Sequence, residues 1–143
     1  MMHRLARTIL LALLLATCAH DQGADQDQSV TLSLTNAGAQ PLRCRVMFGH
    51  WVDRDLGALQ PGAVTSLAIT QAAADGALYV LRSDGARKMM IETIQCAQPG
   101  SWMETYGQVD LAPIRSRRVR AIEASCAAPA GEGRVTCRAD PVQ

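Results

Sequence analysis

The stretch Ser29–Thr35, with the sequence SVTLSLT, alternates polar and apolar side chains along its length. Valine or leucine occupies every second position, and successive side chains of an extended strand point to opposite faces of a sheet. The stretch therefore predicts a half-buried β-strand with one face in the protein core. A second alternating stretch, Leu42–Phe48, follows the turn-forming residues 36–41. Together the two stretches predict a hairpin with a longer loop.

Short stretches rich in β-forming residues continue this pattern toward the end of the chain. Turn signals such as Gln60–Gly62 and Ser83–Gly85 separate them. In the stretch 88–96 the cleaner apolar face lies opposite Cys96, which indicates a bulge or a strand end near that cysteine. We expect further strands at 64–69, 77–81, 88–96, 109–114, 117–125 and 134–138.

About seven or eight short strands at regular spacing are typical of a β-sandwich. We therefore expect a mainly β protein, a small disulfide-stapled sandwich of the Ig-like or Greek-key kind. The length of 143 residues fits one domain, placed at residues 29–143. A polar flexible linker at 20–28 and an export signal at 1–19 precede it. The order in which the strands pair stays open.

The N-terminus carries the three zones of an export signal in their usual order. Arg4 and Arg7 supply positive charge, residues 9–16 (ILLALLLA) form a short apolar run, and small residues follow at 17–19. The apolar run is too short to span a bilayer unaided. We therefore expect an exported bacterial protein, located in the periplasm or anchored to the cell envelope.

Residues 15–18 (LATC) resemble the lipobox of bacterial lipoproteins, in which the cysteine becomes the lipidated first residue. Thr17 departs from the Gly, Ala or Ser that usually precedes that cysteine. Lipidation of Cys18 and its removal with the signal both leave four cysteines, so the cysteine count does not separate the two outcomes. Contact with the membrane is expected only through the signal or through a lipid on Cys18.

Four cysteines remain in the exported chain, and an oxidising compartment favours disulfides between them. A turn centred on Gly131–Glu132 would place Cys126 opposite Cys137, close enough for a bridge. By elimination Cys44 pairs with Cys96, which closes a loop of roughly 50 residues and stabilises the fold by about 3–4 kcal/mol. No pair has the CxxC spacing of a zinc ribbon, so disulfides are favoured over a metal–thiolate site.

Charge and aromatic content argue against a nucleic-acid binder. The chain has 14 Lys and Arg against 13 Asp and Glu, a net charge of +1. Nucleic-acid binders usually carry a strong basic excess. Aromatic residues make up 3% of the chain, too few for a groove that stacks single-stranded bases.

Three clusters of polar or aromatic residues are candidate binding surfaces. His50 and Trp51 begin the densest polar cluster, residues 50–55, which we expect to be a loop at a strand end with Trp51 covering the core. Trp102 and Tyr106 lie in a Gly-bounded loop that either anchors an interface or folds back over the core. A basic run suits an acidic partner, lipid headgroups or a charged edge strand. Its members are Arg115, Arg117, Arg118 and Arg120.

These features favour a non-enzymatic exported module that binds or stabilises a protein partner in the cell envelope. If the partner adds a strand to a sheet edge, we expect that edge to be the N-terminal strand. We assign no catalytic residue, no metal site and no cofactor.

Two alternative functions stay open. His50 and the methionines offer imidazole and thioether ligands that suit copper, although the spacing of Cys44, Met47 and His50 matches no copper signature. His50 with Asp53 would suit a small hydrolase, although no Ser, Thr or Cys stands out as its nucleophile.

Overall fold

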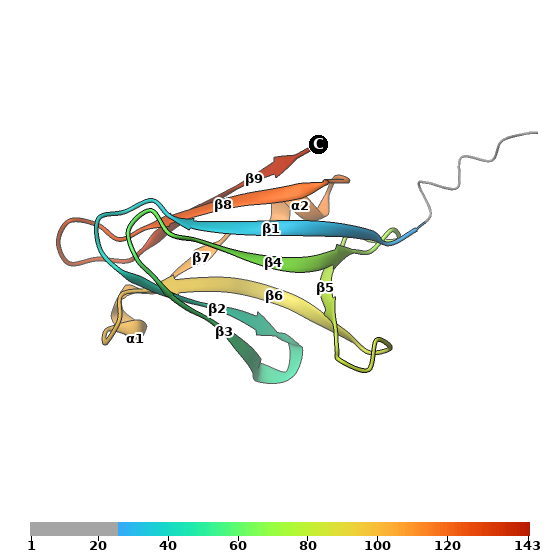
Figure 1. The fold of residues 1–143 in the computed structure, drawn as a ribbon, viewed down its shortest axis with the longest axis horizontal. Helices are drawn as coiled ribbons and strands as arrows, with labels where there is room; N and C mark the ends of the chain where they lie inside the picture. Colours follow the sequence, from blue (N-terminus) through green and yellow to red (C-terminus); the bar gives the residue numbers. More distant parts are fainter. Residues whose placement is uncertain (1–25) are drawn as a thin grey trace, which may run out of the picture.

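The computed structural model describes residues 26–143, and the predicted export signal and Cys18 lie outside them. The described chain is mainly β, with nine strands in one mixed sheet (Figure 1). The strands are β1 (Gln28–Asn36), β2 (Leu42–Phe48), β3 (Val52–Leu59), β4 (Val64–Gln71), β5 (Leu78–Leu81), β6 (Lys88–Ala97), β7 (Gly107–Val109), β8 (Ala121–Ala127) and β9 (Thr136–Val142). Two short helices, α1 (Trp102–Thr105) and α2 (Ala112–Arg115), and a 3-10 turn, η2 (Gly49–Trp51), connect them. Within residues 26–143, none of the helices has both the length and the apolar character needed to cross a membrane.

The strands follow the order β3-β2-β6-β5-β4-β1-β8-β9, and β7 pairs with β6 beside this path. β1 is antiparallel to β4 on one side and parallel to β8 on the other. The predicted hairpin between 29–35 and 42–48 is therefore wrong, because β2 pairs with β3 and β6 instead. The prediction that the N-terminal strand forms an exposed edge is also wrong, because β1 pairs with β4 on one side and with β8 on the other.

A buried side chain explains why the chain leaves β1 without forming that hairpin. The amide of Asn36 donates hydrogen bonds to the carbonyls of Gln40 and Leu59, and its oxygen accepts one from the backbone N–H of Gly38. These bonds tie the connection after β1 to the end of β3, so β2 starts in the other part of the sheet. Alternation of apolar residues defines which face of a strand is buried, but it does not define its neighbour.

β6 joins the two parts of the sheet. Residues 88–90 pair with β5, whereas residues 91–97 pair with β2. The register with β2 shifts between Met47 and Phe48, so the buried positions of β6 change phase after Ile91 and resume at Ile94. The bulge lies near the middle of β6 and not at Cys96, whereas the other predicted possibility, a strand end near Cys96, is confirmed because β6 ends at Ala97.

The buried faces of the strands share one hydrophobic core. The alternating residues of β1 and β2 are buried as predicted, and β4, β6 and β8 add further aliphatic side chains. Both predicted disulfides are present, Cys44–Cys96 and Cys126–Cys137. Each joins residues that lie directly opposite one another on paired strands, with Cα atoms 4.1 Å apart.

The β8–β9 hairpin has the predicted register at its disulfide, but its loop is longer than the predicted two-residue turn. The strands end at Ala127 and start again at Thr136, so Gly131–Glu132 lies within a loop at 128–135. Val135 is buried, and its backbone N–H donates a 2.7 Å hydrogen bond to the carbonyl of Thr105. This contact draws the loop away from β8 and onto the end of α1.

The strands predicted at 109–114 and 117–125 are shorter than expected, because Gln71 binds the segment between them. The buried side chain of Gln71 donates to the carbonyls of Ile114 and Arg117 and accepts from the backbone N–H of Val119. Backbone groups held in this way cannot join a sheet ladder. The chain therefore forms α2 and an irregular segment before β8 begins at Ala121.

Candidate functional site

A groove of about 570 Å³ lies between the η2 turn and the β5–β6 hairpin. The turn and the hairpin lie at the lower edge of the fold in Figure 1. The lining combines apolar and basic side chains and contains no carboxylate among the described residues. It consists of Gly49, His50, Val52, Arg82, Arg87, Lys88, Met89 and Met90.

The η2 turn holds two consecutive non-glycine residues in the left-handed backbone region. His50 has φ 66° and Trp51 has φ 64°. For residues with a Cβ atom this conformation costs about 1–2 kcal/mol each. Strain of this kind is concentrated at binding and catalytic sites, where the surrounding structure maintains it.

Trp51 projects into solvent and is 91% exposed. The prediction that it covers the core is therefore wrong, and so is the prediction of a loop over residues 50–55. Residues 52–59 form β3, whose first four residues are all exposed. A strand exposed on both faces shows no alternation of apolar residues, which is why its sequence did not predict it.

Apolar side chains are concentrated around the groove. Val52, Leu81 and Met90 are each at least two-fifths exposed. Val52 directly follows Trp51 at the start of β3, whereas Leu81 and Met90 belong to the two strands of the β5–β6 hairpin. Single exposed apolar residues are common on protein surfaces, but a group of them beside a groove marks an interaction surface.

Ion pairs fix the basic rim of the groove. Lys88 Nζ lies 2.8 Å from Asp27, which also accepts a hydrogen bond from the Tyr79 hydroxyl. The hydrogen bonds from Lys88 and Tyr79 hold the pKa of the Asp27 carboxyl well below its usual range. The hydrogen bond that Lys88 donates to Asp27 raises the pKa of Lys88. These contacts place the start of β1 beside the hairpin.

The hairpin turn predicted at Ser83–Gly85 is present and is stabilised by Asp84. The carboxylate of Asp84 accepts hydrogen bonds from the backbone N–H groups of Ala86 and Arg87, and it forms a 2.8 Å ion pair with the Arg87 side chain. The backbone bond from Arg87 is the main cause that lowers the pKa of Asp84. Arg87 is therefore held at the rim of the groove.

The structure shows which residues of the alternative copper site and of the alternative hydrolase site lie together. His50, Met89 and Met90 line the same groove, whereas Met47 does not, and Cys44 is in a disulfide. Asp53 lies 3.8 Å from Arg45 across the β2–β3 pair. Within residues 26–143 no Ser, Thr or Cys lines the groove that contains His50.

Trp102 and Tyr106 lie in and just after α1, away from the groove in Figure 1. The guanidinium of Arg45 lies 4.1 Å from the centroid of the Trp102 ring, and that of Arg134 lies 4.8 Å from the Tyr106 ring. Both aromatic side chains are half-buried. These aromatics therefore pack against arginines of the chain itself and do not join His50 and Trp51.

The basic run does not form the charged edge strand that the sequence suggested. Arg115 donates a 2.9 Å hydrogen bond to the carbonyl of Ile91, and Arg118 donates one of the same length to the carbonyl of Gln26. Arg117 and Arg120 are exposed. The run is an irregular segment whose backbone is bound by Gln71, so its alternation cannot lead to strand pairing.

The sequence prediction missed the basic residues on the hairpin side of the groove, Arg82, Arg87 and Lys88, and it considered the methionines of that side only as copper ligands. The hairpin signal at Ser83–Gly85 carries basic residues on both sides and two methionines after it. These residues around the hairpin turn were the evidence in the sequence that could have identified this side of the groove. Only the fold shows that the hairpin faces the η2 turn.

No protein-family model matches this chain, and no curated protein matches it in sequence. An NMR structure of a protein from Eubacterium rectale is similar over 87% of this chain and 95% of its own. The sequence identity is 10% and the TM-score is 0.42. We draw no functional conclusion from a similarity of this size.

Proposed function

We propose that this protein is an exported, non-enzymatic β-domain that binds a protein partner in the cell envelope through the groove. The observation that carries the proposal is Trp51, held 91% exposed by a left-handed turn at the edge of the groove. Exposed tryptophan is the side chain most often found to dominate protein interfaces. A strained turn that exposes it has no benefit for stability, which supports a role in binding.

The groove suits a peptide segment that combines acidic and apolar side chains. Its basic residues, Arg82, Arg87 and Lys88, would attract carboxylates of a partner, in addition to the pairs that Arg87 and Lys88 form with Asp84 and Asp27. Its floor includes Met89 and Met90, whose flexible side chains adapt to apolar groups of different shapes.

The remaining predictions fit this proposal. We propose that the nine-stranded sheet forms a disulfide-stapled sandwich of the Ig-like or Greek-key kind. Such a sandwich is a rigid scaffold that carries binding turns at its ends. The two disulfides support an oxidising location, such as the periplasm or the outer side of the envelope. The absence of a hydroxyl or thiol nucleophile from the lining of the described groove supports binding over hydrolysis.

Methionine methyl resonances provide a direct test. Met89 and Met90 lie in the groove, whereas Met103 is exposed on α1 outside it. The ligands are three synthetic peptides: an acidic one with a central Trp-Leu, a basic one with the same centre, and an acidic one with Gly-Ser at the centre. We expect the acidic Trp-Leu peptide to shift the methyl resonances of Met89 and Met90 and to leave that of Met103 unchanged.

Two variants at exposed apolar side chains complete the test, since Trp51 is 91% exposed and Met103 is 71% exposed. Trp51→Ala should weaken binding of the acidic Trp-Leu peptide at least about tenfold, as for an interface residue that dominates binding. Met103→Ala should leave binding unchanged, since Met103 lies outside the groove. Equal binding of the basic peptide, or shifts confined to Met103, would contradict the proposal.

A second candidate function is copper binding in the same groove. It is favoured by one observation, that His50, Met89 and Met90 share the lining, because imidazole and thioether groups are ligands for Cu(I). Cu(I) added without peptide should then shift the same two methyl resonances at one equivalent. Met89→Leu, which keeps the apolar volume, should abolish the copper shift and preserve peptide binding. The two functions are thereby separated.

A further inference from the structure

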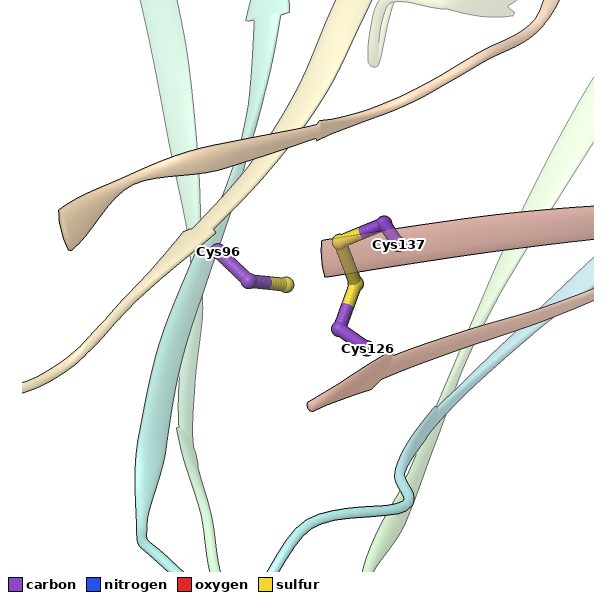
Figure 2. A group of neighbouring side chains, drawn as sticks. All are labelled: Cys96, Cys126 and Cys137. Atoms are coloured by element: carbon purple, nitrogen blue, oxygen red, sulfur yellow. A yellow bond between two sulfur atoms is a disulfide. The ribbon is translucent and has the colours of Figure 1, made fainter. Parts of the chain in front are cut away.

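The two disulfides meet inside the core, although their strand pairs are far apart in the sequence. The sulfur atoms of Cys96, Cys126 and Cys137 all lie within 4.8 Å of one another. Figure 2 shows the Cys96 sulfur pointing toward the Cys126–Cys137 bridge. Cys44 lies outside this group of three, but its sulfur is bonded to that of Cys96, so it is one bond away from the group.

We propose that the reduced chain, before its disulfides form, binds one Zn²⁺ ion at these four cysteines. The site is independent of the groove and of the function proposed for it. A tetrahedral zinc–thiolate site has Zn–S distances of about 2.3 Å, which places its sulfur atoms about 3.8 Å apart. The Cys96 sulfur therefore needs to approach those of Cys126 and Cys137 by at most about 1 Å, and reduction lets the two sulfurs of each disulfide move apart from bonding distance.

The arrangement of the strands supplies the ligands in two pairs. Cys44 and Cys96 lie directly opposite each other on β2 and β6, and Cys126 and Cys137 do so on β8 and β9. Two ligands from each of two such facing pairs can fill the four positions of a tetrahedron. The backbone already provides this geometry without the CxxC spacing of a zinc ribbon.

The surroundings fit a structural metal site. Cys44, Cys96 and Cys126 are at most 1% exposed, so bulk water cannot compete for the ligand positions. Cys137 is half-buried and borders a shallow pocket of about 230 Å³ that reaches the surface beside Arg138. This pocket provides an entry path, which a buried metal site requires.

The chemistry balances with thiols as the starting state. The newly made chain carries four Cys–SH groups, and zinc displaces their protons as it binds. Two equivalents of a small disulfide oxidant, such as oxidised glutathione, then accept the four electrons. The four thiolates become two protein disulfides, the oxidant and four protons become four small thiols, and Zn²⁺ is released.

The test uses the full chain with Cys18→Ser, because Cys18 would otherwise add a fifth thiol. The protein is reduced under anaerobic conditions and titrated with Co²⁺, which reports thiolate coordination and tetrahedral geometry by its absorption. We expect saturation at one equivalent, with a tetrathiolate spectrum that one equivalent of Zn²⁺ abolishes. Oxidised glutathione should then release the metal and restore the two disulfides, detected by intact mass.

Two controls separate a folded site from loose thiols. Cys96→Ser removes the ligand at the centre of the cluster and should weaken metal binding at least about tenfold. The same titration in concentrated urea keeps all four thiols and should lose the single-equivalent endpoint. A tetrathiolate spectrum that persists in urea, or no such spectrum in the folded reduced chain, would overturn the proposal.

Discussion

Replacing Trp51 by glycine should stabilise the protein relative to replacing it by alanine. The side chain is 91% exposed, so either change removes little buried area, and the two variants differ mainly in their backbone preference. At φ 64° a residue with a Cβ atom is strained by about 1–2 kcal/mol, whereas glycine is not. Glycine also loses more chain entropy on folding, by about 0.4–1 kcal/mol, which offsets part of this gain. The expected net advantage of glycine is about 0.5–1 kcal/mol.

Urea unfolding followed by circular dichroism measures this difference as a change in the midpoint. Exchanging alanine for glycine at Ala68 should change stability in the opposite direction, because Ala68 is exposed in β4 and has an ordinary strand backbone. Ala68→Gly should lower the free energy of unfolding by about 0.5–1 kcal/mol. If Trp51→Gly is less stable than Trp51→Ala, the turn does not hold a left-handed residue, and the strain argument for the binding site is refuted.

Three further predictions concern the scaffold. Gln71→Met keeps the side-chain volume but removes three hydrogen bonds to the backbone, including the bond from the buried Val119 N–H, and it should lower the free energy of unfolding by about 1–3 kcal/mol in urea titrations; an unchanged midpoint would contradict the role of Gln71. Gly107→Ala would place a Cβ atom 1.8 Å from the carbonyl oxygen of Val135, so it should displace the loop at 128–135 and cost about 1–3 kcal/mol, with faster amide exchange at Val135 as the readout. The pKa of Asp27 is lower in the folded chain than in the unfolded one, so its stabilising effect is complete above about pH 4 and is lost as the pH falls below that value. Asp27→Asn should therefore melt at a lower temperature than the parent at pH 7 and at nearly the same temperature near pH 2; an equal gap at both pH values would count against this ion pair with Lys88.

Local features of the fold could be predicted from the sequence, because they depend on residues close together in the chain. The alternation in Ser29–Thr35 and Leu42–Phe48 placed the buried faces of β1 and β2 correctly. Counting residues back from a turn placed Cys126 opposite Cys137, even though the actual loop is longer. Both inferences use only the period of an extended strand.

Long-range features could not be predicted in this way. The pairing of β1 with β8 and the contacts of Gln71 with 114–119 join segments that are far apart in the chain. The groove could not be predicted for the same reason. The η2 turn and the β5–β6 hairpin each show a local sequence pattern, but the two segments meet only in the fold. His50 and Trp51 were therefore predicted as candidates, whereas the basic residues of the opposite wall were not.

The parallel pairing of β1 with β8 has a consequence for the order of folding. Residues 31–36 at the start of the domain take as partners residues 121–126 near its end. Closing so large a loop is slow, and the central strand keeps an open hydrogen-bonding edge until nearly the whole chain is present. A ribosome or a translocation channel that still holds the last strands therefore prevents completion of the sheet. The sheet is therefore completed only after residues 121–126 become free to pair with β1.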